Sequence, residues 1–319
     1  MSTILQEATT AIQDFLKIYP NGIVVLWWAT ATGKSSLSVE LGRTLPCEII
    51  SSDSRQFFRG MDIGTDKVSQ AIRDEIPHHQ IDMIDPDAFY TAGQWKKDVC
   101  NLIPQIQVRG RIPLIVWWTG LYVDTLYKNY SVPEVEPDFE LRAQRDELEA
   151  NEQWVLWKKL HAIDPIEAAK HHPNSTRYIS RALEIHAKTG LTKTDAAKEQ
   201  PVQRPMLMIW LRREKEDSNE RIATRVWEML QAWLIDEVQW LLAKWHSPEL
   251  QSMQGIGYKE VVAYLHGLGT RDEGLEKLQE IITIHTQQYA KRQRTWFKRY
   301  IKDATENPKK DVVYKVFML

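Results

Sequence analysis

The sequence has little cysteine and no long apolar run. Its two cysteines, Cys47 and Cys100, are too few for a zinc site, and their contexts, a strand start and a helix, are typical of buried thiols. No apolar run approaches the roughly 20 residues that cross a bilayer. The first 20 residues lack the basic-then-apolar layout of a signal peptide. We therefore expect a cytoplasmic protein with no membrane partner.

Excess charge of either sign is also missing. The formal net charge is −2, which argues against nucleic-acid binding through the whole surface, so a polyanion site must be a local basic face. The chain has 319 residues, of which 43% are hydrophobic and 26% charged. These values are typical of a soluble globular protein with one large domain and an insertion, or with two domains.

Glycine is scarce while tryptophan is plentiful. There are 14 glycines and 13 tryptophans, so glycine is about 4% of the chain where roughly 7% is usual. Two tryptophan pairs are adjacent, Trp27-Trp28 and Trp117-Trp118. Tryptophan thus stands where loops usually carry glycine.

A phosphate-binding loop is predicted near the N-terminus. Residues 23–26 are typical of a buried parallel strand, and a helical pattern begins at Gly33. Between them lies the second half of a G-x-x-x-x-G-K-[ST] motif. In such a loop backbone N–H groups hold phosphate oxygens, Lys34 supplies a charge, and the Ser35 hydroxyl can reach Mg²⁺. The predicted phosphate-binding residues, for a nucleotide or a diphosphate, are Thr30, Ala31, Thr32, Gly33, Lys34 and Ser35, whereas Trp28 stands at the position of the motif's first glycine.

A carboxylate follows the second predicted strand. Residues 47–51 form that strand, and Asp53 comes directly after it. In an open α/β sheet ligands bind at the carboxyl ends of the strands, so Asp53 is placed for chemistry. An aspartate before serine is also common as a helix cap or in a turn, and the residue taken alone leaves both interpretations open.

The remaining pattern predicts an α/β fold, a P-loop doubly wound, mostly parallel sheet with a helical insertion domain. Further strands are expected at 80–84, 112–116 and 206–211, with helices at 92–108, 219–244 and 275–300. No strand pattern appears between 140 and 198, where 141–161, 165–170 and 176–189 have helical spacing. We expect a first core part at 1–133, a helical insertion at 134–204, and a second core part at 205–319.

The last predicted helix is basic and aromatic. Residues 281–302 contain no acidic residue. They carry Lys291, Arg292, Arg294, Lys298, Arg299 and Lys302, interleaved with Tyr289, Trp296, Phe297 and Tyr300. Basic groups meet phosphates and aromatic rings stack on unpaired bases, which favours an RNA-binding face. The alternative is an aromatic core stripe with a solvated basic face.

An ordered set of motifs resembles a known family. Residues 52–67 read S-D-S-R-Q-F-F-R-G-M-D-I-G-T-D-K. With T-A-T-G-K-S, they resemble the D-S-x-Q-x-[YF]-[RK]-G-M-D-I-G-T-x-K signature of the tRNA dimethylallyltransferases. Further matches follow in order across nearly the whole chain, at 77–82, 110–122, Asn174, 181–184, Arg221, Arg225, 255–260 and 291–297.

The resemblance implies transfer of a dimethylallyl group from dimethylallyl diphosphate to the exocyclic N6 amine of the adenine 3′-adjacent to the anticodon of tRNA. The loop would then hold the diphosphate leaving group with Mg²⁺, and no ATP would be hydrolysed. Arg225 resembles the family's diphosphate-binding arginine, and Arg221 lies one turn away. The alternative for both arginines is surface pairing with Glu220 and Glu228.

Asp53, Thr119 and Arg225 are the catalytic residues that the resemblance implies. Asp53 would be the general base, because the amine lone pair is delocalised into the adenine ring and attack requires proton removal. Thr119 matches a threonine that contacts the target nucleotide, although it could simply cap helix 120–128. The target base must leave its stack to react. The expected tRNA-binding residues are Asp53, Ser54, Arg55, Gln56, Thr119, Arg142, Arg177, Arg181, Lys259, Lys291, Arg292, Arg294, Thr295, Trp296 and Lys298.

Two competing functions remain at this point: a P-loop small-molecule kinase, and a catalytically impaired tRNA-binding protein. The second arises because the resemblance expects glycine at Trp28, Trp117, Trp118, Trp154, Trp210 and Trp233. If these tryptophans replace glycines, indole rings at the loop would weaken diphosphate binding. Alternatively, the rings fill core space or line a prenyl channel. The partners we expect are the tRNA anticodon stem-loop and dimethylallyl diphosphate, bound by a monomer.

Overall fold

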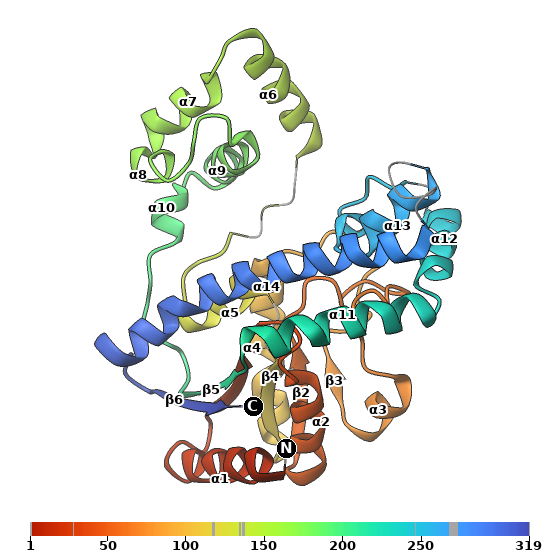
Figure 1. Cartoon of the computed structure of the whole chain (residues 1–319). Helices are drawn as coiled ribbons and strands as arrows, with labels where there is room; N and C mark the ends of the chain where they lie inside the picture. Colours follow the sequence, from red (N-terminus) through yellow and green to blue (C-terminus); the bar gives the residue numbers. More distant parts are fainter. Residues whose placement is uncertain are drawn as a thin grey trace. The chain divides into compact units, whose positions relative to one another are not determined.

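The computed structural model describes residues 2–27, 29–116, 119–133, 135, 138–245, 247–267 and 274–318. It divides into two compact units (Figure 1). The core unit comprises Met1–Tyr90, Val99–Val123 and Arg204–Leu319, and the helical unit comprises Thr91–Asp98 and Asp124–Gln203. The expected insertion at 134–204 therefore lies almost wholly in the helical unit, which begins ten residues earlier and includes a short stretch near residue 95.

A six-stranded sheet forms the centre of the core unit. Its order is β3-β2-β4-β1-β5-β6, and every neighbouring pair is parallel. The strands are β1 (Ile23–Trp27), β2 (Cys47–Ser51), β3 (His78–His79), β4 (Ile112–Val116), β5 (Met206–Arg212) and β6 (Val312–Met318). The predicted α/β fold with a mostly parallel sheet is confirmed. Because the strands are parallel, the segments after β1, β2 and β4 start from one edge of the sheet.

Helices cover both faces of this sheet. The helices of the core unit, some shared with the helical unit, are α1 (Ser2–Ile18), α2 (Lys34–Thr44), α3 (Gln70–Glu75), α4 (Ala92–Val108), α5 (Gly120–Tyr127), α11 (Lys215–Gln231), α12 (Leu234–Trp245), α13 (Tyr258–Leu265) and α14 (Gly274–Glu306). On one face, Ala8, Ile12 and Phe15 of α1 pack with the apolar side chains of β1 and β5. On the other, Trp27 contacts Phe297 and Tyr300 of α14, with ring centroids 5.4 Å apart in each pair.

The helical unit has its own small core. It contains α6 (Phe139–Asn151), α7 (Val155–Ile163), α8 (Pro165–Ala168), α9 (Thr176–Thr189) and α10 (Lys193–Ala196). Leu156 and Leu160 of α7 pack against Ile179, Ala182 and Leu183 of α9. Their three- and four-residue spacing is the pattern from which the helical insertion was predicted.

Three sequence expectations were wrong in detail. The strand expected at 80–84 is a two-residue strand at His78–His79, because Gln80 and Asp82 have φ angles of 62° and 54° that do not continue a strand. The single helices expected at 141–161 and 219–244 are each two helices. The breaks fall at Trp154 and Trp233, whose φ angles are 65° and 73°.

The six tryptophans at expected glycine positions divide into three groups. Trp154 and Trp233 adopt the left-handed backbone that glycine tolerates and a bulky residue resists. Trp210 lies in β5, where its ring stacks on Trp27 at 5.4 Å, so this indole fills core space. Trp28, Trp117 and Trp118 lie outside the described residues.

Across the part of the chain that the structure describes, no helix combines the length and the apolar character needed to span a membrane.

Candidate active site

The phosphate loop, residues 29–35, joins β1 to α2 at the carboxyl edge of the sheet. Gly33 caps α2 with a φ angle of 89°, a conformation that glycine adopts without steric cost. The Thr32 hydroxyl and the Lys34 amino group donate to the same carbonyl oxygen, that of Ala29, at 2.9 and 2.7 Å. The loop therefore folds back over Ala29 and leads into a helix N-terminus, the usual setting of a phosphate site.

Lys34 is the buried cation of this loop, with 1% of its surface exposed. Burial lowers the pKa of Lys34 to about 7, and the positive charge of Arg225 contributes to this shift. The carboxylates of Asp53 and Asp66 oppose it. Near neutral pH the ammonium group is close to losing its proton, and an anion bound beside it would favour the charged form.

Two arginines of α11 reach the loop. Nη2 of Arg225 donates to the Thr30 hydroxyl at 2.8 Å, and its Nη1 lies 2.8 Å from a carboxylate oxygen of Asp66. Nε of Arg221 donates to the carbonyl oxygen of Ala31 at 3.2 Å. Both arginines thus lie against the predicted diphosphate-binding residues. The alternative of surface pairing named Glu220 and Glu228 as partners, whereas the ion pair of Arg225 is with Asp66.

Asp53 and Thr119 meet at the ends of the neighbouring strands β2 and β4. The Thr119 hydroxyl accepts the Ser54 N–H at 3.3 Å, which links the two segments. The Asp53 carboxylate accepts the N–H of Arg55 at 2.8 Å, so it also performs the turn role that its sequence context allows. Burial raises the pKa of Asp53, although the N–H bonds from Arg55 and Gln56 oppose that shift. A raised pKa brings a carboxylate closer to the range of a useful base.

Two further side chains at this site come from α14 and were missed in the sequence. Oε1 of the buried Gln293 accepts the N–H of Thr30 at 2.9 Å. Tyr289 hydrogen-bonds with Thr119 and with Gln293, and burial raises the pKa of its hydroxyl to about 12. In the sequence, Tyr289 stands out only as one of the aromatic residues of the basic helix. No local signal marks either contact, because Thr30 and Gln293 are 263 residues apart in the chain.

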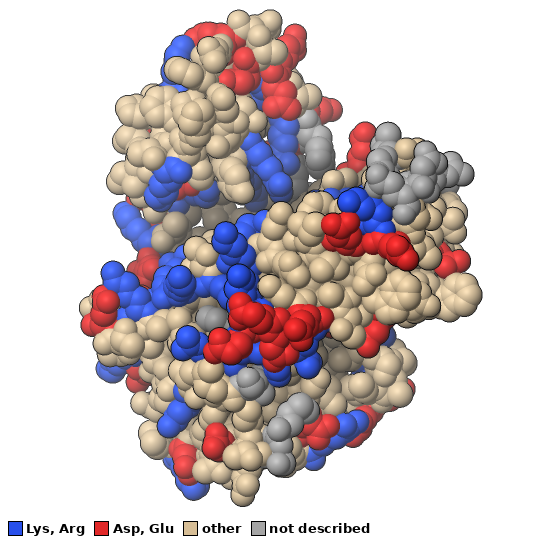
Figure 2. All heavy atoms as spheres, viewed as in Figure 1, with Lys and Arg blue, Asp and Glu red and all other residues tan. Residues whose placement is uncertain are grey.

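A groove runs along the outer side of α14. It has a volume of about 710 Å³ and is lined by Gln288, Lys291, Arg292, Thr295, Trp296 and Arg299. The Arg299 guanidinium lies 3.6 Å from the centre of the Trp296 ring, a stacked cation–π contact. Figure 2 shows Lys and Arg side chains gathered over this part of α14, next to acidic side chains around the start of α11.

One residue of the groove, Trp296, lies against the start of α5. Trp296 packs so closely on Gly120 that a β-carbon added to that glycine would lie 2.4 Å from the indole nitrogen. Gly120 directly follows Thr119, so the aromatic wall of the groove ends beside the candidate nucleotide contact. Phe297 and Tyr300 are instead buried in the core, so the aromatic core stripe is present on one face of this helix, while RNA binding by its basic face stays a prediction.

The other predicted tRNA-binding residues of the core unit differ in burial and in bonding partners. Nη1 of Arg55 donates to the carbonyl oxygen of Gln251 at 2.6 Å, and Gln56 is buried, bonded to Ser51 and to the Thr65 carbonyl. Lys259 lies 3.6 Å from Glu260. Ser54 is half-buried beside Thr119, Lys298 is exposed, and burial lowers the pKa of the partly buried Arg294.

Three predicted tRNA contacts belong to the helical unit. Arg142 and Arg181 both pair with the buried carboxylate of Glu184, at 2.6 and 3.0 Å. Arg181 also donates to the carbonyl oxygen of Val135 at 2.7 Å. These two arginines therefore stabilise the unit itself, while Arg177 is exposed.

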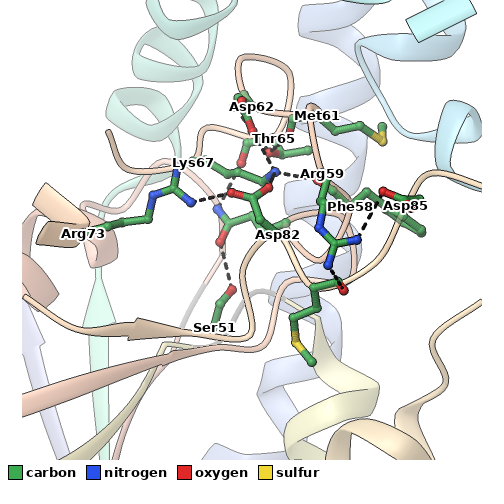
Figure 3. A network of polar contacts seen from close by, with 12 residues as sticks. Ser51, Phe58, Arg59, Met61, Asp62, Thr65, Lys67, Arg73, Asp82 and Asp85 are labelled. Carbon is green, nitrogen blue, oxygen red and sulfur yellow. Dashed lines mark hydrogen bonds and ion pairs between the residues drawn. The ribbon is translucent and has the colours of Figure 1, made fainter. Parts of the chain in front are cut away.

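A polar network holds the signature segment that follows Asp53 (Figure 3). The buried amino group of Lys67 donates to the carbonyl oxygen of Phe58 at 2.6 Å and to the carboxylates of Asp62 and Asp82 at 2.8 and 2.5 Å. Arg73 pairs with the other oxygen of Asp82. Lys67, Asp62 and Asp82 thus have a structural role, which is to hold the loop that follows Asp53.

Glu237 of α12 fixes the same segment from the other side. Its carboxylate accepts the backbone N–H groups of Asp62, Ile63 and Gly64 at 3.0, 2.8 and 3.3 Å. It also accepts the Tyr258 hydroxyl at 2.6 Å. Sequence reasoning missed Glu237, because nothing local marks a glutamate whose backbone partners lie 173 to 175 residues away.

Hydroxyl and carboxylate side chains lie around the predicted Mg²⁺ contact. Ser35, the predicted Mg²⁺ contact, lines a small cavity of about 20 Å³ together with Ser51 and Asp66, which is room for about one water molecule. Among the described residues no group of three or more His, Cys, Asp or Glu could hold a metal by itself. These residues suit Mg²⁺, which usually keeps several waters and takes its other ligands from substrate phosphates.

The sequence and the fold match one family throughout. The family model described as IPP transferase matches residues 56–300. The tRNA dimethylallyltransferase of Pelotomaculum thermopropionicum is 40% identical over 280 residues, covering 87% of this chain and 88% of that protein. That of Thermotoga neapolitana is 41% identical over 271 residues, covering 85% and 87%.

Solved structures give the same result. A eukaryotic dimethylallyltransferase acting on tRNA superposes with a TM-score of 0.75 at 31% identity, covering 92% of this chain and 73% of that chain. The tRNA isopentenylpyrophosphate transferase of Bacillus halodurans has a TM-score of 0.63 at 34% identity, covering 93% and 90%. The chain is therefore an enzyme of the prenyltransferase class. It belongs to the IPP transferase family.

Proposed function

We propose that this protein transfers the dimethylallyl group of dimethylallyl diphosphate to the N6 amine of the adenine 3′-adjacent to the anticodon in tRNA. The observation that carries the proposal is the meeting of three features at one sheet edge. These are a phosphate loop with two arginines, a partly buried carboxylate at Asp53, and a basic, aromatic groove whose Trp296 packs on Gly120, next to Thr119. Its relatives' names and its family support the same chemistry.

The diphosphate is the leaving group. The bond between its oxygen and the first carbon of the prenyl chain breaks, and the electron pair stays on the diphosphate. Lys34, Arg225 and the N-terminus of α2 stabilise that charge. Ser35 would hold Mg²⁺, which supplies a further positive charge on the phosphate oxygens when bound. ATP has no role in this reaction, and the loop binds a substrate's diphosphate instead.

The adenine amine is the nucleophile. As the new bond from N6 to carbon forms, one amine proton must leave, and Asp53 accepts it as general base. Thr119 contacts the target nucleotide from the end of β4. The adenine reaches this point by leaving its stack, while Trp296 and the basic side chains of the groove hold the neighbouring bases and phosphates.

The tRNA substrate bears on where the enzyme acts and on which residue of the helical unit contacts the RNA. Because the acceptor is a tRNA anticodon stem-loop, we place the enzyme in the cytoplasm, acting as a monomer that combines both substrates in one chain. Arg177 is exposed on the helical unit and is free of the Glu184 pairing that occupies Arg142 and Arg181. It is therefore the residue of that unit that we assign to tRNA contact.

Mass spectrometry of tRNA incubated with the protein, dimethylallyl diphosphate and Mg²⁺ tests the proposal. We expect a mass gain of one dimethylallyl group, located by nuclease digestion at the adenosine after the anticodon. Gel-shift binding of tRNA without any mass gain would instead support the catalytically impaired alternative that Trp28 raises. Phosphorylation of a small molecule from ATP would support the kinase alternative.

A further inference from the structure

The inner face of α14 contacts both halves of the candidate site. Tyr289 and Gln293 are four residues apart, so they lie one above the other on one side of the helix. Gln293 contacts the phosphate loop through the N–H of Thr30, at 2.9 Å. Tyr289 contacts Thr119, the candidate nucleotide-binding residue, and also Gln293. One turn of α14 thus contacts both the phosphate loop, which would bind the prenyl donor, and Thr119, which would contact the acceptor nucleotide.

The outer face of the same helix lines the groove. Gln288, Arg292 and Thr295 lie on the groove side, while Gln293 is 5% exposed. The helix itself is fixed in the core through Phe297 and Tyr300, which pack on Trp27. A helix anchored in this way gives Tyr289 and Gln293 a rigid base from which to hold other groups in place.

Thr30 is held from two sides. Arg225 of α11 binds its hydroxyl at 2.8 Å, while Gln293 of α14 accepts its backbone N–H. Thr30 is buried, with 4% exposed, so its N–H has little access to water as an alternative acceptor. Without Gln293, the loop must shift to pair that N–H elsewhere, and the anion site built on the loop shifts with it.

We propose that Gln293 and Tyr289 are positioning residues for the transfer reaction. Gln293 sets the conformation of the phosphate loop, and thereby the affinity for the donor's diphosphate. Tyr289 orients the Thr119 hydroxyl, and thereby the acceptor nucleotide. The Tyr289 part rests on the proposed function, whereas the Gln293 part requires only that the loop binds diphosphate.

Two substitutions separate the two roles. Gln293→Met keeps the length of the side chain and removes its hydrogen-bonding groups, and Tyr289→Phe removes only the hydroxyl. Gln279→Met is the matched control, because Gln279 is another glutamine of α14 whose side chain bonds to a backbone carbonyl, that of Ala223 in α11, at 3.5 Å. The measurements are the Kd of inorganic pyrophosphate by calorimetry, and kcat and KM with dimethylallyl diphosphate and an anticodon stem-loop.

We expect a split between the variants. Gln293→Met should weaken pyrophosphate binding about tenfold, equivalent to about 1.4 kcal/mol, and raise the KM for the donor. Tyr289→Phe should leave pyrophosphate binding within about twofold and lower kcat about tenfold. Gln279→Met should change neither quantity. A general loss of packing would change both the pyrophosphate Kd and kcat in both variants. Separate effects of the two substitutions on these quantities therefore identify positioning.

The proposal is overturned if Gln293→Met binds pyrophosphate within twofold of the parent, if Tyr289→Phe retains full kcat, or if Gln279→Met shows the same losses. Should Gln293→Met not fold, Gln293→Asn withdraws the acceptor by one methylene and carries the same expectation. If the parent transfers no prenyl group to tRNA, the proposed function fails, and the pyrophosphate measurement still decides the role of Gln293.

Discussion

Asp66 and Arg225 form an ion pair inside the candidate diphosphate site, with 2.8 Å between Oδ2 and Nη1. The pair places a negative charge next to the cations that would bind the donor. Asp66 also acts on Lys34, since its charge raises the pKa of that buried ammonium group against the effect of burial. A carboxylate here therefore orients Arg225 and favours the charged form of Lys34.

Asp66→Asn should shift the pH dependence of pyrophosphate binding. The pKa of Lys34 is about 7, so the ammonium form is complete well below that pH, and affinity should fall as the pH rises through it. Removing the Asp66 charge lowers this pKa, so the fall should move to lower pH. Calorimetric titration over a pH series checks the shift.

Lys34→Arg is the control for this effect. A guanidinium group stays charged throughout the pH series. The pH profile of pyrophosphate binding by Lys34→Arg should therefore show only the titration of pyrophosphate itself. If Lys34→Arg and the parent show the same decline, Lys34 does not titrate near neutral pH. An Asp66→Asn midpoint equal to that of the parent would also contradict the account.

Asp53→Asn should slow transfer by roughly 10² to 10⁴, the usual contribution of a general base. Asparagine retains an oxygen that can accept the Arg55 N–H at 2.8 Å, so the turn at Asp53 is preserved and only the basic group is lost. Affinity for tRNA should stay within a few-fold. Single-turnover rates and gel-shift binding measure the two quantities. Transfer at more than a tenth of the parent rate would show that Asp53 is not the base.

Arg292→Gln combined with Lys298→Gln should reduce the salt dependence of tRNA binding. Each phosphate contact to a single strand contributes about 0.7 to the slope of log K against log salt, so losing two should reduce it by about 1.4. Lys277→Gln is the control, since Lys277 is an exposed cation near the other end of α14 that pairs with Glu280. An unchanged slope in the double variant would place the RNA elsewhere.

Trp233→Gly should stabilise the fold. The Trp233 side chain is 70% exposed, and its φ angle of 73° lies in the left-handed region, which costs a non-glycine residue about 1–2 kcal/mol. Relief of that strain should raise the free energy of unfolding by about 1 kcal/mol in urea titrations. Trp227→Gly is the control, because it makes the same substitution inside α11. There glycine should lower the free energy of unfolding by about 1 kcal/mol. A Trp233→Gly protein less stable than the parent would refute the strain argument.

Local sequence predicted those parts of the site whose residues are close together in the chain. The loop from Thr30 to Ser35 and the position of Asp53 after a strand follow from short motifs and from the parallel sheet. The contacts of Gln293, Tyr289 and Glu237 did not follow, because their partners lie far away in the chain and glutamine, tyrosine and glutamate occur in many roles.

The misplaced helix boundaries have a related cause. Glycine at positions 154 and 233 would have indicated where each helix ends. Tryptophan gives no such signal, and the apolar spacing continues across both breaks. The backbone nevertheless turns there with positive φ angles.

The central claim is that the phosphate loop binds a leaving group that is released as the prenyl chain moves to tRNA. The most direct test measures pyrophosphate released and dimethylallyl groups gained by tRNA in the same reaction, with Mg²⁺ and without ATP. We predict one pyrophosphate per modified adenosine, with neither product formed when tRNA is omitted. Modification that requires ATP hydrolysis, or pyrophosphate release without modification of tRNA, would contradict the account.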